Sequence, residues 1–418
     1  MSAQLQQNTP TPPTSFKKRL TLIGPGFVAA ATGVGTGDLV AALVAGAGFG
    51  LVFVWAIIVG SILKHFLNEG VGRWHLATGK TILEGWREMG RWATGYFGIY
   101  SVIWGFVYGA AASSACALAM HAMFPVLPFW AWAVLHSLLG FALVWTGRYQ
   151  LFEKIMMVLI ALMFITVIGS AALFLPNMGD LLKGVVPTVP KGSFMLALGL
   201  IGGVGGTITM ASYGYWLKEK GWKGKEWIPT MRLDSKAAYI MTAIFTLSLL
   251  IVGSQFLFGT GIELKGDQGL IKLTNLLSDK YGAVISWLFL IGFWSAAFSS
   301  LLGVWNGVPY LFADFIRIIK KQVDKPVTET DPAYRLYLVW LTFPPMILLF
   351  FGKPIELIIL YGALGALFMP FLSLSLLWLL NSKRVEKAYR NSLLGNIVFV
   401  ACILLFVVLA VRELSGMF

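Results

Sequence analysis

The sequence predicts an all-α membrane protein, a bundle of eleven transmembrane helices made of two five-helix halves and a last helix. Three observations predict it. Hydrophobic residues fill 57% of the 418 positions and charged residues only 12%, whereas about a quarter of an average soluble domain is charged. Apolar runs long enough to cross a bilayer recur along the chain. The first and the sixth of these runs carry glycine clusters near their centres.

The composition also excludes several classes of protein. A net charge of +13 suits a nucleic-acid partner, but no polar stretch is long enough to form a binding domain. Cys116 and Cys402 lie inside apolar runs, where packing is their simplest role. The sequence contains no nucleophile elbow, phosphate-binding loop or HExxH motif. We therefore expect neither an enzyme nor a cofactor, and no nucleic-acid partner.

The first part of the chain is predicted to be a tail. Residues 1–18 are rich in Pro, Thr and Gln and should form a disordered cytoplasmic segment. The apolar run that follows is too long for a signal peptide and lacks a small-residue cleavage site. We therefore expect this run to be the first membrane helix.

Eleven helices are then predicted in order, and their apolar runs are continuous, which excludes a β-barrel. Residues 19–176 should form the first five-helix repeat, 193–381 the second, and 390–412 the last helix. The individual helices are expected at about 22–48, 50–68, 95–123, 127–146, 152–175, 193–217, 237–258, 282–310, 336–351, 355–380 and 391–411.

The distribution of basic residues predicts the orientation of the bundle. Most of the 32 Lys and Arg residues fall in the tail and in the loops after even-numbered helices. The positive-inside rule then places the amino terminus in the cytoplasm and the carboxyl terminus outside. We expect an integral protein of a plasma membrane or bacterial inner membrane, with the lipid bilayer as a partner and no obligate protein partner. Lys64 is left inside the second helix.

The two glycine clusters predict where the helices break. Residues 33–38 read Gly-Val-Gly-Thr-Gly-Asp, and residues 199–207 contain five glycines. Glycine in a helix interior costs about 1 kcal/mol relative to alanine, so both helices are weakened at mid-membrane. Paired interrupted helices in corresponding positions of two halves indicate a secondary transporter built from inverted repeats. The alternative is that the glycines only allow close helix packing.

Polar residues beside the two clusters are the candidate site. Asp38 is the one acidic residue expected at mid-depth, where a charge costs at least about 2.5 kcal/mol. It either lines a site or caps the second half of helix 1. Thr207, Met210, Ser212 and Tyr213 follow the second cluster, and their alternatives are core filling for Met210 and satisfaction of freed backbone groups for the hydroxyls.

Several motifs resemble the Nramp family of divalent-metal transporters, which have the LeuT fold. The resemblance covers nearly the whole chain and implies a carrier, proton-linked or passive, whose substrate lies between broken helices 1 and 6. The motifs are Gly24-Pro25-Gly26-Phe27, Ala45-Gly46-Ala47-Gly48-Phe49-Gly50, Thr78-Gly79-Lys80, Phe298-Ser299-Ser300 and Met369-Pro370-Phe371.

The ligand motifs of the family depart from their usual form in this chain. The Asp-Pro-Gly-Asn motif of helix 1 falls on Gly35-Thr36-Gly37-Asp38, and the Met-Pro-His motif of helix 6 on Met210-Ala211-Ser212. The glutamine of helix 10 falls on Phe368, and helix 3 has no carboxylate between Tyr108 and Ala117. With few anionic ligands, we expect a divalent cation that keeps part of its water, as magnesium does.

The resemblance and the residue chemistry together give one expected site. A divalent cation is expected beside Asp38 and Met210, and a sodium site at Ser299 and Ser300, whose hydroxyls alternatively serve their own helix. A carrier of a small organic solute and a scaffold or receptor without transport are the other two hypotheses. The expected substrate-binding residues are Gly35, Thr36, Gly37, Asp38, Gly206, Thr207, Met210, Ser212, Tyr213 and Phe368.

Overall fold

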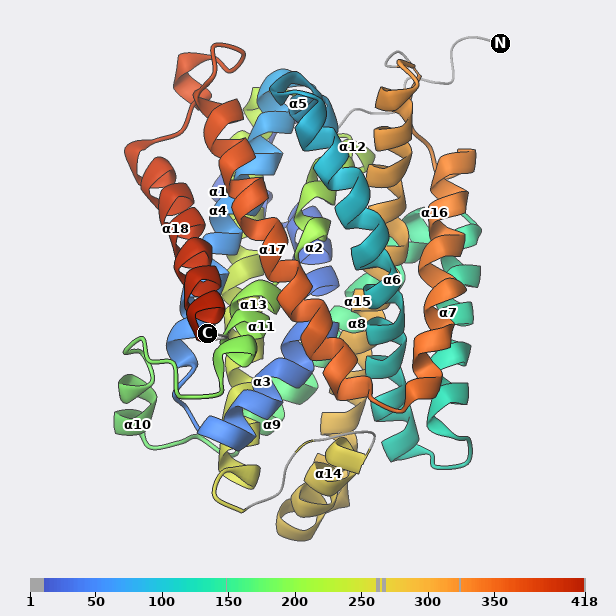
Figure 1. Cartoon of the computed structure of the whole chain (residues 1–418), viewed down its shortest axis with the longest axis vertical. Coiled ribbons are helices and arrows are strands. Elements are labelled where there is room, and N and C mark those ends of the chain that lie inside the picture. The colour runs from blue at the N-terminus through green and yellow to red at the C-terminus, as the bar shows by residue number, and fades with distance from the viewer. Residues whose placement is uncertain (1–10, 148, 261–263, 265–267, 323–324, 417–418) are drawn as a thin grey trace.

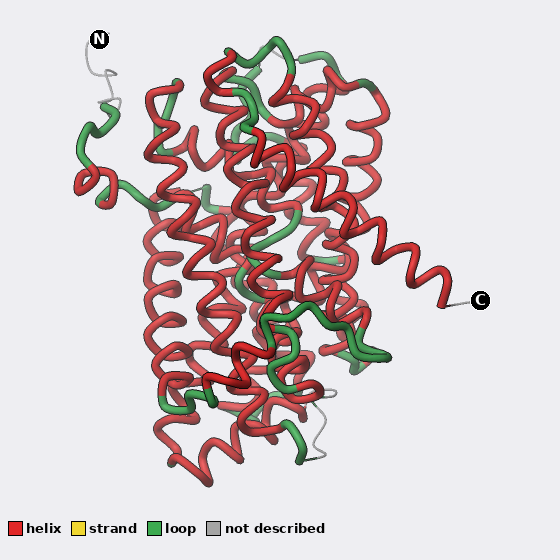
Figure 2. The backbone as a smooth tube through the Cα atoms, turned by 90° about the vertical axis from the view of Figure 1, so that its left-hand side faces the viewer, coloured by secondary structure: helices red, strands yellow, loops and turns green. Residues whose placement is uncertain are grey.

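The protein is a bundle of long helices, as the sequence predicts. The computed structural model describes residues 11–147, 149–260, 264, 268–322 and 325–416, without the side chains of 36–38, 268, 366 and 409–416. The regular structure of these residues is helical throughout (Figures 1 and 2). Eight helices are long and apolar enough to cross a membrane, and shorter apolar helices accompany them. The all-α membrane fold is confirmed, whereas the number of eleven spans stays a prediction.

The first half of the chain contains the elements up to α10. Its helices are α1 (Phe16–Leu20), α2 (Pro25–Gly33), α3 (Thr36–Phe49), α4 (Val54–Thr78), α5 (Ile82–Met89), α6 (Arg91–Met123), α7 (Phe129–Trp145), α8 (Tyr149–Met163), a π-helical turn η1 (Phe164–Ile168), α9 (Gly169–Ala172) and α10 (Met178–Lys183).

The second half contains the remaining elements, and its long helices α13, α15 and α17 pack against helices of the first half. They are α11 (Phe194–Gly203), η2 (Ile208–Ser212), α12 (Tyr213–Glu219), η3 (Lys225–Trp227), α13 (Ile228–Leu257), α14 (Gln268–Tyr281), α15 (Ala283–Ile319), α16 (Pro332–Thr342), η4 (Pro344–Phe351), α17 (Pro354–Asn381), η5 (Lys387–Tyr389) and α18 (Leu393–Gly416).

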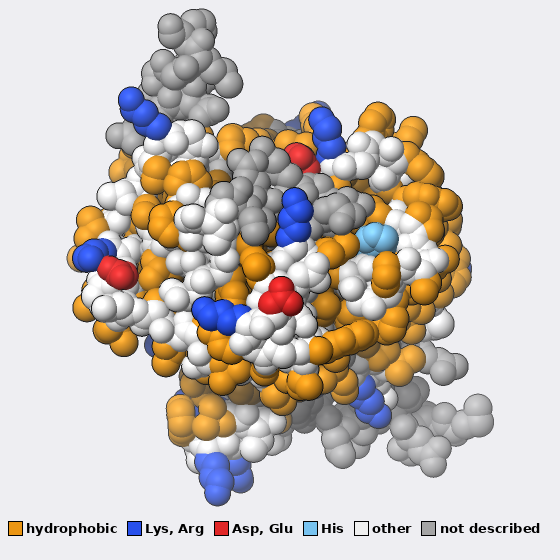
Figure 3. All heavy atoms as spheres, turned by 90° about the horizontal axis from the view of Figure 1, so that it is seen from below, with side chains coloured by type: hydrophobic (Ala, Val, Ile, Leu, Met, Phe, Trp, Pro, Cys, Tyr) orange, Lys and Arg blue, Asp and Glu red, His pale blue; other side chains and the backbone are white. Residues whose placement is uncertain are grey.

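Apolar side chains cover much of the outer surface, as a membrane requires. Seen from the end that carries α14, hydrophobic side chains occupy much of the rim and charged side chains are sparse (Figure 3). Many of the exposed hydrophobic residues lie on long helices, among them Ile99 and Ile103 of α6 and Ile240 of α13. The fold therefore presents an apolar girdle around a buried core.

Three helices run further than their apolar patterns predict. α4 continues to Thr78 rather than ending near 68, α13 begins at Ile228 rather than near 237, and α15 reaches Ile319 rather than 310. Three carboxylates in the added turns, those of Glu69, Asp234 and Asp314, are hydrogen-bonded inside the bundle, so these charges do not end the helices. At the end of the segment predicted as a tail, Ser15 caps the short helix α1, which begins at Phe16. Residues 1–10 lie outside the described part.

The helix α5 was not among the predicted elements, although its start has a sequence signal. Thr81 accepts a hydrogen bond from the Glu84 amide at 3.2 Å, and the Glu84 carboxylate accepts one from the Thr81 amide at 2.8 Å. This reciprocal arrangement is a capping box, which satisfies two amides that the first turn leaves free. The helix is too short and too polar for a search that looks for membrane spans.

Both predicted helix breaks are present. α2 ends at Gly33 and α3 begins at Thr36, while α11 ends at Gly203 and the chain resumes as the 3-10 turn η2. Gly205 and Gly206 have φ of +70° and +95°, a backbone region that favours glycine. The breaks also touch, because a methyl group on Gly33 would collide with the backbone of Gly205 and Gly206.

We expect Gly33→Ala to destabilise the fold strongly. The added methyl group meets backbone atoms that cannot rotate away, so the cost should reach at least about 3 kcal/mol, the upper range of overpacking. The thermal midpoint of the purified protein measures the effect. Gly48→Ala in α3 is the matched control, since a methyl group there has open space. Equal midpoints for the two variants would contradict the contact between the breaks.

Candidate functional site

The two breaks form the centre of the site, and two long helices of the bundle, α15 and α17, pack against them. The Ser300 hydroxyl on α15 donates to the carbonyl of Thr32 at 2.6 Å, which satisfies a group beside the break of helix 1. A methyl group on Gly35 would strike Ser300, and one on Gly365 of α17 would strike Thr207. In Figure 1, α17 crosses in front of α2 and α3. The site therefore lies between both breaks, α15 and α17.

Side chains from two neighbouring helices donate hydrogen bonds to carbonyl groups of the helix 6 break. Lys64 on α4 is fully buried, and its ammonium donates to the carbonyl of Gly202 at 2.7 Å. Tyr239 on α13 donates to the carbonyl of Gly205 at 3.0 Å. Gly202 lies in the last turn of α11, where the helix dipole favours a positive charge. A fixed cation thus lies beside the break.

Two hydroxyl groups at this break have no hydrogen-bond partner among the described residues. They belong to Thr207 and Thr209, which are 0% and 2% exposed. An unmade hydrogen bond of a buried group costs about 1–3 kcal/mol, so buried polar groups are nearly always satisfied. These hydroxyls are therefore candidate contacts for a bound solute.

An aromatic cluster on α6, α15 and α17 adjoins the break of helix 1. Trp104 stacks on Tyr108 with ring centroids 4.6 Å apart, and Tyr361 lies 4.8 Å from Tyr108. Tyr108 also donates to the carbonyl of Ser300 at 2.9 Å, which connects the cluster to the site. The indole N–H groups of Trp104 and Trp305 are buried without an acceptor among the described residues. The cluster thus offers donors as well as aromatic faces.

The predicted helix 6 residues divide between the site and its support. Thr207 and Gly206 lie at the break, and the thioether of Met210 is buried one turn beyond. Ser212 donates to the carbonyl of Gly307 on α15 at 3.0 Å, and Tyr213 donates to Asp234 on α13 at 2.8 Å. Ser212 and Tyr213 therefore hold the second half of helix 6 against neighbouring helices.

The remaining predicted residues lie in an aromatic cluster, within α15 or at the break of helix 1. Phe368 packs in an aromatic cluster, with its ring centroid 5.1 Å from that of Tyr100 and 6.1 Å from that of Trp86. Ser299 donates to the carbonyl of Ala296 within its own helix at 3.0 Å. The side chains of Thr36, Gly37 and Asp38 lie outside the described part of the structure. Among the side chains that it describes, no three His, Cys, Asp or Glu residues are grouped to hold a metal ion.

Comparison with known proteins identifies the family. A family model described as natural resistance-associated macrophage protein-like (Nramp) matches residues 26–415. The chain belongs to this family. It is 24% identical to the metal transporter nramp1 homolog of Dictyostelium discoideum over 73% of this chain and 58% of that protein. It is 23% identical to the uncharacterized membrane protein YcsG of Bacillus subtilis over 89% and 88%. The chain thus spans little more than half of the Dictyostelium relative.

Solved structures confirm the LeuT fold of this Nramp-family chain. The manganese transporter of Eremococcus coleocola superimposes with a TM-score of 0.80 at 16% identity, covering 97% of this chain and 88% of that one. MhsT in complex with L-phenylalanine gives 0.57 at 14% identity, covering 94% and 98%. At such identities the likeness concerns the fold, and the substrate has to be argued from the site.

A buried carboxylate anchors the first half of helix 1 in this family member. Asp234 of α13 accepts hydrogen bonds from the amides of Gly24 at 2.8 Å and Gly26 at 2.5 Å. Both amides lie at the amino end of α2, where the helix dipole favours a negative charge. Tyr213 of α12 donates to the same carboxylate at 2.8 Å. Asp234 thus ties the first half of helix 1 and the second half of helix 6 to α13.

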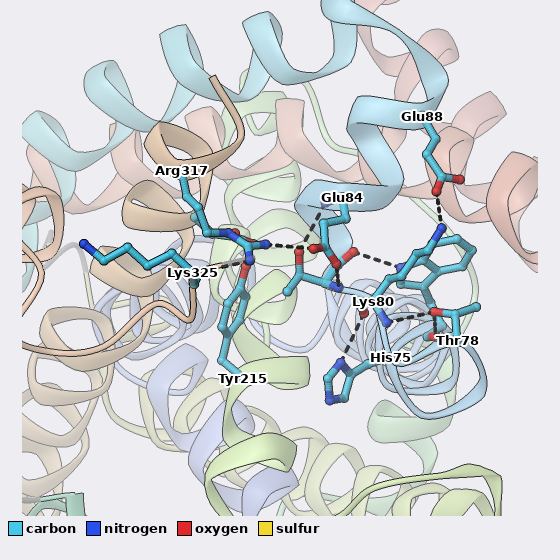
Figure 4. A network of polar contacts seen from close by, with 11 residues as sticks. His75, Thr78, Lys80, Glu84, Glu88, Tyr215, Arg317 and Lys325 are labelled. Carbon is cyan, nitrogen blue, oxygen red and sulfur yellow. Dashed lines mark hydrogen bonds and ion pairs between the residues drawn. The ribbon is translucent and has the colours of Figure 1, made fainter. Parts of the chain in front are cut away.

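A second polar network closes the end of the bundle that carries α5. Arg317 of α15 donates to Asp314 at 2.6 Å and to Glu84 of α5 at 2.8 Å, and Tyr215 of α12 donates to Asp314 (Figure 4). Figure 4 shows Arg317 lying between Tyr215 and Glu84. The second half of helix 6 is therefore connected to α15 and α5 as well as to α13.

Sequence reasoning missed several residues that build this site. Asp234 was assigned to a loop because the apolar pattern of its helix starts near residue 237. Lys64 stood out as a charge inside a predicted span, which is a signal for function that can be read from sequence. Gly365, Tyr239 and Trp305 carry no such signal, because only the packing of α17, α13 and α15 brings them to the centre.

Replacing Asp234 tests the anchor. Asp234→Asn keeps the shape of the side chain but loses its charge and one acceptor oxygen, so we expect a loss of about 2 kcal/mol or more in the free energy of unfolding. Asp180→Asn is the control, because its carboxylate is exposed and forms only a surface ion pair with Lys183. Thermal midpoints measure both. An Asp234→Asn midpoint equal to that of the control would show that the carboxylate anchors nothing.

Stability should also depend on the protonation of Glu329, in the loop before α16. Burial raises the pKa of this carboxyl above its ordinary value of 4.5, and hydrogen bonds from Tyr310 and Asn306 oppose the shift. Asn306 donates to Glu329 at 3.1 Å. Because the folded state takes up this proton at a higher pH than the unfolded state, acidification toward pH 4.5 stabilises the fold.

The variant Glu329→Gln measures this contribution. We expect the wild type to gain stability relative to Glu329→Gln as the pH is lowered toward 4.5, and the difference to level off below that value. Unfolding midpoints of the two proteins across a pH series give the difference directly. A difference that stays constant across the series would refute the raised pKa.

Proposed function

We propose that this Nramp-family protein is a secondary carrier that moves a divalent metal cation across the membrane by alternating access. The cation would lie, partly hydrated, between the breaks of helices 1 and 6. The observation that supports this most is the contact of the two breaks at Gly33 and Gly206, with the buried, unpaired hydroxyls of Thr207 and Thr209 beside it.

The chemistry of the site favours a hard cation. Hydroxyl and carbonyl oxygens are the donors that magnesium and similar ions prefer, and a magnesium ion usually keeps several waters. The thioether of Met210 would add affinity for a softer ion such as zinc. Asp38, which begins the second half of helix 1, would supply the negative charge. These donors support a divalent ion that is only partly stripped of water.

Alternating access would be gated by contacts at the amino end of α2. The ion pair of Lys220 and Glu153 joins α12 to α8 at 2.5 Å. Gly24 lies beneath this pair, since a methyl group there would be 3.5 Å from Lys220 and 3.6 Å from Glu153. We infer that this pair breaks when α2 swings outward, while the glycine break acts as the hinge. With the predicted orientation, this gate faces the cytoplasm.

A second candidate function is the transport of a small organic solute that carries a carboxylate. The observation that favours it is the buried ammonium of Lys64 beside the helix 6 break. A fixed positive charge repels a divalent cation and attracts an anionic group. The indole N–H groups of Trp104 and Trp305 would donate to such a solute. The two candidates therefore predict opposite roles for Lys64.

Uptake into proteoliposomes tests the proposed function. We expect wild-type protein to carry manganese or magnesium, and Asp38→Ala to lower the uptake at least about 10-fold, as loss of a charged ligand should. Asp180→Ala is the control that removes an exposed carboxylate outside the site. Unchanged cation uptake by Asp38→Ala would overturn the metal site.

The variant Lys64→Met separates the two candidates. If the substrate is a cation, removing the ammonium should leave uptake equal or higher, whereas uptake of labelled organic acids should fall if they are the substrate. Lys154→Met, at an exposed position on α8, is the control. Absence of uptake for both classes of solute by the wild type would favour a scaffold or receptor instead.

A further inference from the structure

A basic groove lies at the edge of the bundle, away from the two breaks. Its volume is about 560 Å³, and it is bounded by α4, α13 and the segment that leads into α18. Arg73, Arg232, Lys236, Lys387 and Arg390 line it, and Glu69 is the carboxylate among its lining residues. The groove is therefore strongly positive.

The floor of the groove is rigid. Glu69 accepts from Arg73 at 3.0 Å and from Arg232 at 2.8 Å, so its charge is already matched. Arg73 also donates to the carbonyl of Tyr389 and to the side chain of Asn391, each at 2.9 Å. These bonds fix the loop before α18 against α4. Lys236 and Lys387 remain exposed at the mouth of the groove.

Exposed apolar side chains continue from this groove along the membrane face. On α4, Ile58 and Ile62 precede Phe66, which lines the groove, at the i+4 spacing that keeps them on one face. On α13, Ile240 and Ile244 follow Lys236 at the same spacing and are also exposed. α18, whose early turns expose Leu393, Leu394 and Ile397, slopes away from the bundle toward the carboxyl terminus (Figure 2).

We propose that this groove binds the phosphate headgroup of an anionic phospholipid, with the acyl chains lying along the apolar faces of α4 and α13. A positive pocket at the ends of membrane helices, directly continued by lipid-facing apolar side chains, matches both parts of such a molecule. A free phosphate would use the basic groups only and would leave the apolar continuation unexplained. The site is independent of the solute that the carrier moves.

Thermal stabilisation in detergent tests the lipid site. Wild-type protein is titrated with phosphatidylglycerol, with phosphatidylcholine and with inorganic phosphate, and a ligand that binds the native state raises the midpoint. We expect a saturable rise with phosphatidylglycerol and a much smaller one with the other two. An equal rise with phosphatidylcholine would overturn the charge recognition. An equal rise with inorganic phosphate would show an anion site that does not select lipid and would overturn the proposal.

A matched pair of variants locates the site. Lys236→Gln/Lys387→Gln removes two exposed charges and leaves the bonds of Glu69 intact, so the fold should survive. Each lysine near a membrane surface contributes roughly 5-fold, so half-saturation should need about 30-fold more phosphatidylglycerol. Lys223→Gln/Lys383→Gln removes the same charge from exposed positions that do not line the groove. Equal weakening of both double variants, or of neither, would contradict the groove as the binding site.

Discussion

The structure depends on the close approach of two unwound backbones in the middle of a membrane bundle. Helices 1 and 6 can meet at Gly33 and Gly206 because neither residue has a side chain, and Gly205 and Gly206 adopt backbone angles that favour glycine. Breaking a helix in lipid frees amide and carbonyl groups that must be satisfied within the protein. Ser300, Lys64 and Tyr239 do this for carbonyl groups beside the breaks, while the hydroxyls of Thr207 and Thr209 have no partner among the described residues.

Around the breaks, the long helices α13 and α15 form a frame that supports the half-helices α2 and α12. α13 and α15 supply Asp234, Tyr239 and Ser300, which fix the half-helices through hydrogen bonds. Those accepted by the Asp234 carboxylate are charge-assisted. The half-helices α2 and α12 are connected to this frame by the carboxylate of Asp234 and by the hydrogen bond from Tyr215 to Asp314. The ion pair of Lys220 with Glu153 joins the end of α12 to α8. Because these connections are separate, one contact can break and let a half-helix move while the others persist.

Much of this fold, and less of its site, could be predicted from the sequence. The membrane class, both breaks and the family follow from apolar runs, glycine clusters and short motifs. The limits of α4, α13 and α15 could not be predicted, because charges that end an apolar run are here paired inside the bundle. Phe368, aligned to a ligand position, packs among aromatic rings, and Gly365, three residues earlier on α17, meets the break. Which residue of α17 contacts the break depends on tertiary packing and cannot be read from a single sequence.

The position of a bound metal ion tests the account most directly. Crystals of the protein grown with manganese should give an anomalous difference peak between residues 33–36 and 202–209, within coordination distance of oxygen atoms from both breaks. Continuous hydrogen-bonded helices through these two segments, or a manganese peak confined to other parts of the molecule, would contradict the account.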